Sequence, residues 1–341
     1  MQTLLALVAA LIGIVPVVLI YFTVIKSVDR YEPEPWWLLT ACFVWGIFGA
    51  TFFAIIGNEI GALVVSEGLS TSNVQAVTSA TASFVAPPVE ESTKGVALLF
   101  LWALSALWFK ELDGPLDGAI YGGVVGLGFT LTEDVLYVTG ATLQGGSAGG
   151  IAVFILRTIM GGLGHATFTA MTGLGVGIAA ESRNLLVKGL APIGGWMAAV
   201  GLHFLHNFLV TFLFAGGLGL LLKLLVFWTF DMVFFVLLFV LVMRDRAIVM
   251  RGLVDEVGKL LHPKEFKRTT SYSMIVPFWN LLALQGSPGG YWAARRKQLD
   301  LVKLAFVKER IRRGEPENRW ADTLRTRIHQ ANQQGIFVGD R

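Results

Sequence analysis

Residues 87–94 read PPVEESTK and place two adjacent carboxylates, Glu90 and Glu91, close to Lys94. The lysine follows Glu90 by four residues and Glu91 by three, so on a helix it can lie beside either carboxylate. The two prolines favour a helix start, which predicts that the glutamates lie in the first turn, where free backbone N–H groups stabilise negative charge. Such a carboxylate can take a proton from water and later give it to a leaving amine. We take Glu91 as the expected general base, with Glu90 beside it.

A second polar group is the stretch HFLHN, which contains His203, His206 and Asn207. Their spacings of three and four residues predict that the three side chains share one helix face. Imidazole and amide groups can stabilise an oxyanion. Alternatively, two histidines and a glutamate can hold a zinc ion, which lowers the pKa of bound water. No serine is identified as a nucleophile on an elbow turn between a strand and a helix, and the one cysteine, Cys42, has no partner motif, so covalent acyl transfer is not expected.

Glu133, Arg157 and His165 also lie in apolar stretches. An ionisable group at the centre of a membrane helix costs at least about 2.5–3.5 kcal/mol, so each needs a reason to be there. Glu133 and Arg157 are interpreted as a supporting pair, with Arg157 as a structural counter-ion. His165 is a further candidate for the catalytic group. Where a metal is bound, the expected ligands are Glu91, His165, His203 and His206, and zinc is the expected kind of ion.

The helices that must position these residues are membrane spans. Of 341 residues, 54% are hydrophobic and only 15% charged, whereas soluble proteins average about 25% charged residues. A span needs about 20 apolar residues. Seven segments qualify: roughly 2–25, 36–65, 80–109, 115–138, 150–180, 192–215 and 217–243. The predicted fold is therefore all-α, a polytopic bundle of about seven transmembrane helices.

The distribution of basic residues predicts the orientation of the bundle. The loops 26–35, 110–114 and 181–191 carry Lys or Arg, and the alternate loops 66–79, 139–149 and 216–217 carry none. By the positive-inside rule, the N-terminus is outside and the C-terminus cytoplasmic. With this orientation, the candidate residues on four helices fall at one depth, in the middle-to-outer half of the membrane.

The chain divides by charge into a transmembrane domain, 1–243, and a basic cytoplasmic tail, 244–341. The first part holds 8 Lys/Arg and 14 Asp/Glu, and the second holds 19 and 10. Residues 295–330 alternate charged and apolar residues, which predicts one or two amphipathic helices broken near residues 314–316. A basic tail suits an anionic cytoplasmic leaflet, and without a motif no nucleic-acid partner is expected.

Together these elements resemble the PrsW-type intramembrane proteases, within the wider group that contains the CAAX prenyl endopeptidases. The resemblance covers roughly residues 10–243. It rests on EExxK at residues 90–94, GFTLTEDVLY around Glu133, RTIMGGLGHATFT around His165, and HFLHN, in the order of the family. It departs from the family at Asp134, where the resemblance implies an asparagine.

The resemblance implies a protease of the bacterial plasma membrane. Its substrates would be single-pass membrane proteins such as anti-sigma factors, cleaved near the extracytoplasmic side (site-1-type cleavage). The family motifs leave a metal-dependent and a glutamate-only mechanism both open. The rival hypothesis is a proton- or ion-coupled transporter, since glutamates, histidines and an arginine in a bundle also form proton relays. Against transport, the sequence shows no inverted repeat.

Overall fold

The computed structural model describes residues 1–70, 73–109, 111–213, 217–272, 287–316 and 319–339. The described residues form helices and contain no strand, which confirms the predicted all-α class. In hydrocarbon a helix satisfies its own backbone hydrogen bonds. Five segments are long and apolar enough to cross a membrane: Gln2–Val28, Trp36–Gly68, Pro115–Glu181, Leu185–Phe212 and Leu221–Glu256. The chain is thus a multi-pass membrane protein.

The chain forms two compact units. The membrane unit comprises Met1–Lys26 and Glu34–Leu238, and the C-terminal unit comprises Ser27–Pro33 and Phe239–Arg341. The division lies five residues before the boundary at 243 that charge alone predicts. The short segment between the first two spans joins the C-terminal unit, a feature that a linear reading of charge could not indicate.

Several helices of the membrane unit contain π-helical turns, labelled η1 to η5. Its elements are α1 (Gln2–Val28), α2 (Trp36–Val44), η1 (Trp45–Ala50), α3 (Thr51–Gly68), α4 (Val74–Ala80), η2 (Thr81–Val85), α5 (Ala86–Leu104), η3 (Ser105–Phe109), α6 (Pro115–Val153), η4 (Phe154–Ile159), α7 (Gly164–Glu181), α8 (Leu185–Phe208), η5 (Leu209–Leu213) and the first part of α9 (Gly217–Leu253). Single π-turns are often found at functional sites, and here η2 and η4 both adjoin the polar cluster described below.

The fourth and fifth predicted spans form one hairpin. The expected loop at 139–149 is helical, and the chain reverses at Gly146, whose φ of 66° suits glycine. A Cβ added at Gly149 would lie 2.8 Å from the carbonyl oxygen of Ala141, so the two arms run close together beside the turn. The predicted boundary at 138 is wrong because apolar, helix-compatible residues continue almost to the reversing glycine.

The helix that carries Glu90 and Glu91 starts differently from the prediction. Asn73 caps α4 by accepting a hydrogen bond from the Ala76 N–H at 3.2 Å, and α4, η2 and α5 then follow without a break. The glutamates lie in the second turn of α5, whose first turn holds no acid. The expectation that free N–H groups surround them is therefore wrong, because the preceding helical turns lead directly into α5.

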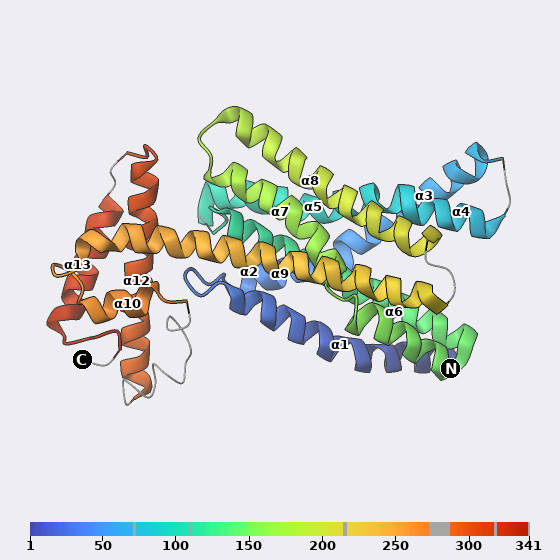
Figure 1. Ribbon diagram of the computed structural model, residues 1–341, viewed down its shortest axis with the longest axis horizontal. Helices are drawn as coiled ribbons and strands as arrows, with labels where there is room; N and C mark the ends of the chain where they lie inside the picture. The colour runs from blue at the N-terminus through green and yellow to red at the C-terminus, as the bar shows by residue number, and fades with distance from the viewer. Residues whose placement is uncertain (71–72, 110, 214–216, 273–286, 317–318, 340–341) are drawn as a thin grey trace. The chain divides into compact units, whose positions relative to one another are not determined.

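Successive connections alternate between the two ends of the membrane unit. Figure 1 shows the start of α1, the end of α3 and the hairpin turn of α6 at one end, and the end of α1 and the α7–α8 connection at the other. This alternation fits the predicted grouping of the loops. Lys110, one of the basic residues used for orientation, lies outside the described residues. Which end is cytoplasmic stays a prediction.

Glycines bring α6 and α7 into close backbone contact. A Cβ added at Gly122 would overlap the Thr169 backbone, and one at Gly126 would overlap the His165 backbone. The small-xxx-small spacing predicts such packing in lipid. Because Glu133 follows Gly126 by two turns on α6, this contact sets the height at which His165 meets the polar residues of α6.

The C-terminal unit is built around the end of α9, with α10 (Pro263–Thr270), α12 (Pro288–Arg312) and α13 (Arg319–Gln333), and a short 3₁₀ turn, η6 (Val254–Glu256). Gly314 has a φ of 91° between α12 and α13, at the predicted break.

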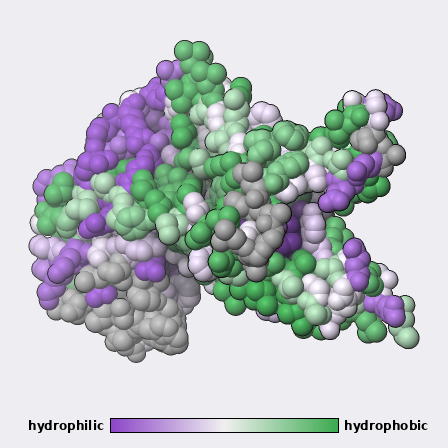
Figure 2. All heavy atoms as spheres, turned by 45° about the vertical axis from the view of Figure 1, so that its right-hand side comes forward, coloured by the Kyte–Doolittle hydropathy of each residue, from purple (hydrophilic) through white to green (hydrophobic). Residues whose placement is uncertain are grey.

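Figure 2 shows hydrophobic residues over much of the visible surface, with hydrophilic residues in a recess between two hydrophobic lobes. Exposed apolar side chains such as Phe48 (69% exposed) and Phe100 (64%) suit contact with lipid tails.

Candidate active site

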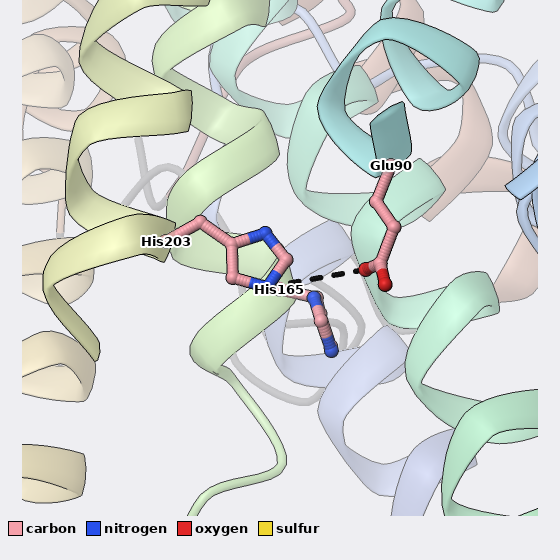
Figure 3. A group of neighbouring side chains, drawn as sticks. All are labelled: Glu90, His165 and His203. Atoms are coloured by element: carbon pink, nitrogen blue, oxygen red, sulfur yellow. Dashed lines mark ion pairs between the residues drawn. The ribbon is translucent and has the colours of Figure 1, made fainter. Parts of the chain in front are cut away.

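Three helices bring one carboxylate and two imidazoles together inside the membrane unit. Glu90 comes from α5, His165 from the start of α7 and His203 from α8 (Figure 3). One ligand atom from each lies within 4.8 Å of the others. Glu90 Oε2 and His203 Nε2 are 3.9 Å apart. The structure thus brings together residues that the sequence placed at one depth, and the carboxylate grouped with one nitrogen of each histidine is that of Glu90, whereas Glu91 contacts the other nitrogen of His203.

Lys94 is fully buried beside this group. Its Nζ lies 2.9 Å from Glu91 Oε1 and 3.4 Å from Glu90 Oε2, as the helical spacing predicts. It also lies 3.0 Å from His165 Nδ1 and 3.8 Å from the centre of the Phe129 ring. An ammonium has three protons to donate, and these three acceptors use them all.

Glu91 is fully buried, and hydrogen bonds occupy both its oxygens. Oε1 accepts from Lys94 and lies 3.0 Å from His203 Nδ1, and Oε2 accepts from the Thr169 hydroxyl at 2.9 Å. An ionised carboxylate only accepts, so His203 carries its proton at Nδ1. The lone pair at Nε2 is then free to face Glu90.

His165 is oriented in the same way by Glu133 on α6. Its Nε2 lies 2.6 Å from Glu133 Oε2, so the ring carries its proton there and keeps the Nδ1 lone pair. The rings of His165 and His203 are 5.0 Å apart and nearly perpendicular, and Phe168 stacks on His203 at 4.9 Å. Two carboxylates thus orient two imidazoles, an arrangement typical of metal ligands. The His203 Nε2 lone pair faces Glu90, and the His165 Nδ1 lone pair accepts from Lys94.

Arg157 continues the network away from the histidines. Its Nη2 lies 2.6 Å from Glu133 Oε2 and its Nε lies 3.0 Å from Asp134 Oδ1. Thr158 donates to the other Asp134 oxygen at 2.8 Å. The Arg157 side chain is 31% exposed, so the network reaches the surface here. Asp134, at the position where an asparagine was expected, supplies a second carboxylate for the same guanidinium.

His206 does not join the candidate ligands, although the sequence suggested it. Its ring lies among Phe168, Phe227 and Phe230, with ring centres 5.1 to 5.6 Å away. Its buried Nδ1 has no hydrogen-bond partner among the described residues. A spacing of three residues turns the side chain about 60° from His203, and the aromatic residues of α7 and α9 then enclose it.

Asn207 also points away from the group, toward the backbone of η2. Its amide donates to the Ala82 carbonyl at 2.8 Å. The Ala86 N–H bonds to Thr81 in this π-helical turn, and Pro87 has no N–H, so Ala82 lacks both usual backbone donors. The asparagine supplies the missing donor and ties α8 to the segment that leads into α5.

Two polar neighbours of the glutamates were not identified from the sequence. Thr169 bonds Glu91, and Asn58 on α3 donates to Glu90 Oε1 at 3.3 Å. The Asn58 Oδ1 atom is buried without a partner among the described residues. Close packing at Gly57, where a Cβ would lie 2.6 Å from Val89, sets α3 against α5. The available signal was the pair Gly57/Gly61, which brackets Asn58.

The charge balance of the network favours a cation. Glu90, Glu91, Glu133 and Asp134 are four carboxylates, whereas Lys94 and Arg157 are two cations. With the histidines neutral and all four acids ionised, two negative charges stay uncompensated in a mainly apolar bundle, which is costly. A divalent ion would neutralise them, and two histidines with one glutamate form a known set of zinc ligands. The residues present therefore fit a divalent metal.

Comparison with known proteins agrees with this geometry. A family described as PrsW family intramembrane metalloprotease matches residues 34–243, which is more than half of the chain. The match contains every residue of the polar network. It ends at residue 243, so it includes only the first few residues of the segment Phe239–Arg341 of the C-terminal unit. Such a family favours proteolysis over the rival hypothesis of transport. No solved structure shows a significant match.

Among curated proteins, the chain is similar to Protease PrsW of Geobacillus kaustophilus (strain HTA426), with 27% identity over 145 residues. The matched part is 42% of this chain and 55% of the relative, so the chain spans about half the length of that protein. The family match over residues 34–243 nevertheless covers the whole site. The chain therefore belongs to the PrsW family of intramembrane metalloproteases, multi-pass proteins of the bacterial cell membrane.

Proposed function

We propose that this protein is an intramembrane endopeptidase whose site holds a divalent metal ion through Glu90, His165 and His203. The observation that carries the proposal is the convergence of these three ligands from α5, α7 and α8. A metal bound there would act as a Lewis acid and make water more acidic. Three protein ligands are typical of catalytic zinc sites, in which a fourth position stays open.

The chain's own residues then have distinct roles. Glu91 orients His203 through Nδ1, and Glu133 orients His165 through Nε2. This assignment changes the role of Glu91 from the general base expected from the sequence to a positioning residue, because three donors already occupy its oxygens. Lys94 offsets the repulsion between the two carboxylates of α5 by pairing with both. It also competes with a metal for the His165 Nδ1 lone pair.

A metal-free alternative uses the same residues. Glu90 is the glutamate with fewer donors, an amide at 3.3 Å and an ammonium at 3.4 Å, and it faces His203 Nε2. In that mechanism Glu90 takes the proton of water and the histidines stabilise the oxyanion. Both mechanisms make Glu90 essential, and only the first requires a metal.

The proposed substrates are single-pass membrane proteins, such as anti-sigma factors, cleaved near the extracytoplasmic side. Support comes from the family resemblance and from the predicted depth of the polar residues in the outer half of the bilayer. The bundle surface is apolar, so a substrate helix could approach through lipid.

The test is cleavage of tagged single-pass reporter proteins by purified enzyme in liposomes. Wild type is compared with Glu90→Gln, Glu91→Gln and Glu59→Gln. Glu59→Gln is the matched control, because it makes the same chemical change at an exposed position of α3 outside the network. Metal content is measured on every sample by mass spectrometry. We expect Glu90→Gln to lose both metal and cleavage, and Glu59→Gln to keep both.

The outcomes separate the mechanisms. If Glu90→Gln loses cleavage while wild type is active without bound metal, the metal-free mechanism is correct. If Glu90→Gln cleaves as fast as wild type, the proposed site is wrong. Glu91→Gln is expected to keep some metal and to cleave more slowly, since its amide oxygen can still accept a hydrogen bond from His203 Nδ1.

A further inference from the structure

The longest helix that lies wholly in the C-terminal unit, α12, has two different faces. Tyr291, Ala294, Leu301 and Leu304 are buried in the core of the unit. An amphipathic soluble helix normally turns polar residues to water on its other side. The outer face of α12 departs from this pattern, because large apolar residues alternate there with cations.

The outer face consists of Trp292, Arg296, Leu299, Lys303 and Phe306, which we call the α12 stripe. Their spacings of four, three, four and three residues keep them on one side of the helix. Trp292 is 59% exposed. Arg296 and Lys303 are exposed, and Leu299 and Phe306 are partly buried. The stripe therefore presents an aromatic residue and two cations outward, with apolar side chains between them.

The two acids of α12 do not neutralise the stripe. Asp300 is buried and pairs with Arg327 of α13 at 3.0 Å. Glu309 is buried and pairs with Arg312 at 3.0 Å and with Arg313 at 3.1 Å. Among the described residues neither Arg296 nor Lys303 forms an ion pair, although Lys303 interacts electrostatically with Asp300 over a longer distance. Both side chains are exposed, so their charges can reach a ligand.

We propose that the α12 stripe binds an anionic lipid surface. Helices that lie in the headgroup region combine Lys and Arg with Trp, Phe and Leu, and tryptophan favours the membrane interface. The stems of Arg296 and Lys303 can follow apolar surface while their charges reach lipid phosphates. A nucleic acid would pair its phosphates with the cations but would offer no apolar surface to the aliphatic Leu299.

Two further features favour lipid as the partner. Residues 244–341 have 19 Lys/Arg against 10 Asp/Glu, which suits an anionic leaflet. The unit is also continuous in sequence with the membrane-spanning part of α9. Tethering turns lipid binding into an intramolecular event at high effective concentration, so even a small stripe can be occupied.

The experiment uses the full chain in nanodiscs, with an environment-sensitive NBD label at Leu299→Cys or, separately, Phe306→Cys, in a Cys42→Ala background. Thr326→Cys, exposed on α13, is the control position. Nanodiscs contain phosphatidylcholine alone or with phosphatidylglycerol. We expect emission from both α12 labels to rise about twofold and shift to the blue in the anionic nanodiscs, as apolar insertion would require. The label at position 326 should not respond.

Charge variants then test whether the stripe itself is responsible. Arg296→Gln with Lys303→Gln should remove the response, whereas Lys264→Gln with Lys267→Gln, an equal change at exposed positions of α10, should leave it. Samples that elute as one symmetrical peak are used. The proposal is overturned if the α12 labels respond equally in both nanodiscs, if both double variants act alike, or if added RNA produces the response in neutral nanodiscs.

Discussion

Each unit contains a buried lysine that pairs with glutamate, but the number of carboxylates around the two lysines differs. Lys297 is 2% exposed and binds Glu265 and the Ile336 carbonyl. The same glutamate accepts from the backbone N–H groups of Val338 and His262, at 2.9 and 3.1 Å. One cation thus meets one carboxylate, and each carboxylate oxygen has a donor. This pair joins α10, α12 and the C-terminal segment.

Lys94 has the same burial but a different balance. It is shared by two carboxylates and an imidazole, and each of these has a second partner on another helix. Removing either member of a buried pair is costly, so both clusters stabilise their unit. The difference is that the Lys94 cluster has two carboxylates and an imidazole for one cation. Such a group can accept a further cation when its acids are ionised.

Metal removal should produce the largest difference between the two clusters, because only the Lys94 cluster is proposed to bind a metal. Dialysis against a chelator is expected to lower reporter cleavage on the order of 10³-fold, since the Lewis acid is lost. Readdition of zinc should restore it. The melting temperature of the metal-loaded protein should also exceed that of the stripped protein, because a ligand that binds only the folded state stabilises it. Chelation without effect on cleavage would contradict a metal at Glu90.

The lysines themselves provide the next test. Lys297→Met leaves Glu265 buried without its cation, and we expect a loss of about 3–5 kcal/mol in the free energy of unfolding. Its cleavage rate per folded molecule should equal that of wild type. Lys94→Met is expected to bind zinc about tenfold or more tightly, because a competing cation leaves the His165 Nδ1 lone pair.

Zinc affinity is measured by competition with a coloured chelator, and unfolding by denaturant titration in detergent. Lys297→Met is the control for zinc affinity, because Lys297 lies outside the proposed metal site. Lys94→Met is the control for the stability of the C-terminal unit, because Lys94 lies in the membrane unit. Equal zinc affinity in the two variants would show that Lys94 and a metal do not share His165.

Glu133→Gln should have a smaller effect than loss of a ligand. The amide can still accept from His165 Nε2, but it no longer balances Arg157, so the imidazole is held less firmly. Changes to such supporting groups typically cost about 10–100-fold in metal affinity or activity. Cleavage and zinc affinity should fall together. A variant with normal zinc affinity and slow cleavage would instead place Glu133 in proton transfer.

Local spacing predicted the parts of the site that one helix determines. The contacts of Lys94 with Glu90 and Glu91 follow from intervals of three and four residues, and the structure has both. Spacing failed at Asn207, because its partner depends on a π-helical turn and on a proline that lacks an N–H 120 residues earlier in the chain. The spacing of Gly57 and Gly61 indicated close helix packing around Asn58, but not its partner Glu90, because that contact depends on how α3 packs across α5.

The overall fold was predictable to a similar degree. Apolar length predicted the helical class, because hydrocarbon imposes helices whatever the detail of the sequence. Seven spans were predicted, whereas five segments of the described residues are long and apolar enough to cross a membrane, and the predicted span at 80–109 is not one of them. The end of the fourth span was missed, since only the backbone angle at Gly146 marks the reversal. The sequence also could not indicate that Glu90, rather than Glu91, faces the Nε2 atom of His203. Adjacent residues on a helix differ by 100°, and helix rotation is set by packing.

The smallest effect concerns a charge of the C-terminal unit outside both clusters. Asp29 is buried, and its carboxylate accepts from the N–H groups of Tyr31 and Glu32 at 2.9 and 3.1 Å. Burial raises the pKa of Asp29 to about 6, and the two hydrogen bonds and Arg295 only partly offset this. Because the folded-state pKa is above the unfolded value of 3.8, the folded protein binds more protons between these values.

This contribution to the free energy of unfolding should therefore decrease as pH rises from about 4 to about 6 and stay constant above. Asp29→Asn removes the titration but keeps one acceptor, so it should be more stable than wild type by about 1–2 kcal/mol at pH 8 and no more stable at pH 4. Denaturant titrations of both proteins at several pH values measure the difference. Cleavage by the membrane unit should be unchanged at pH 8, because Asp29 lies outside the network that holds Glu90. A stability difference independent of pH would mean that Asp29 is ionised in the folded protein throughout this range, and that its hydrogen bonds outweigh its burial.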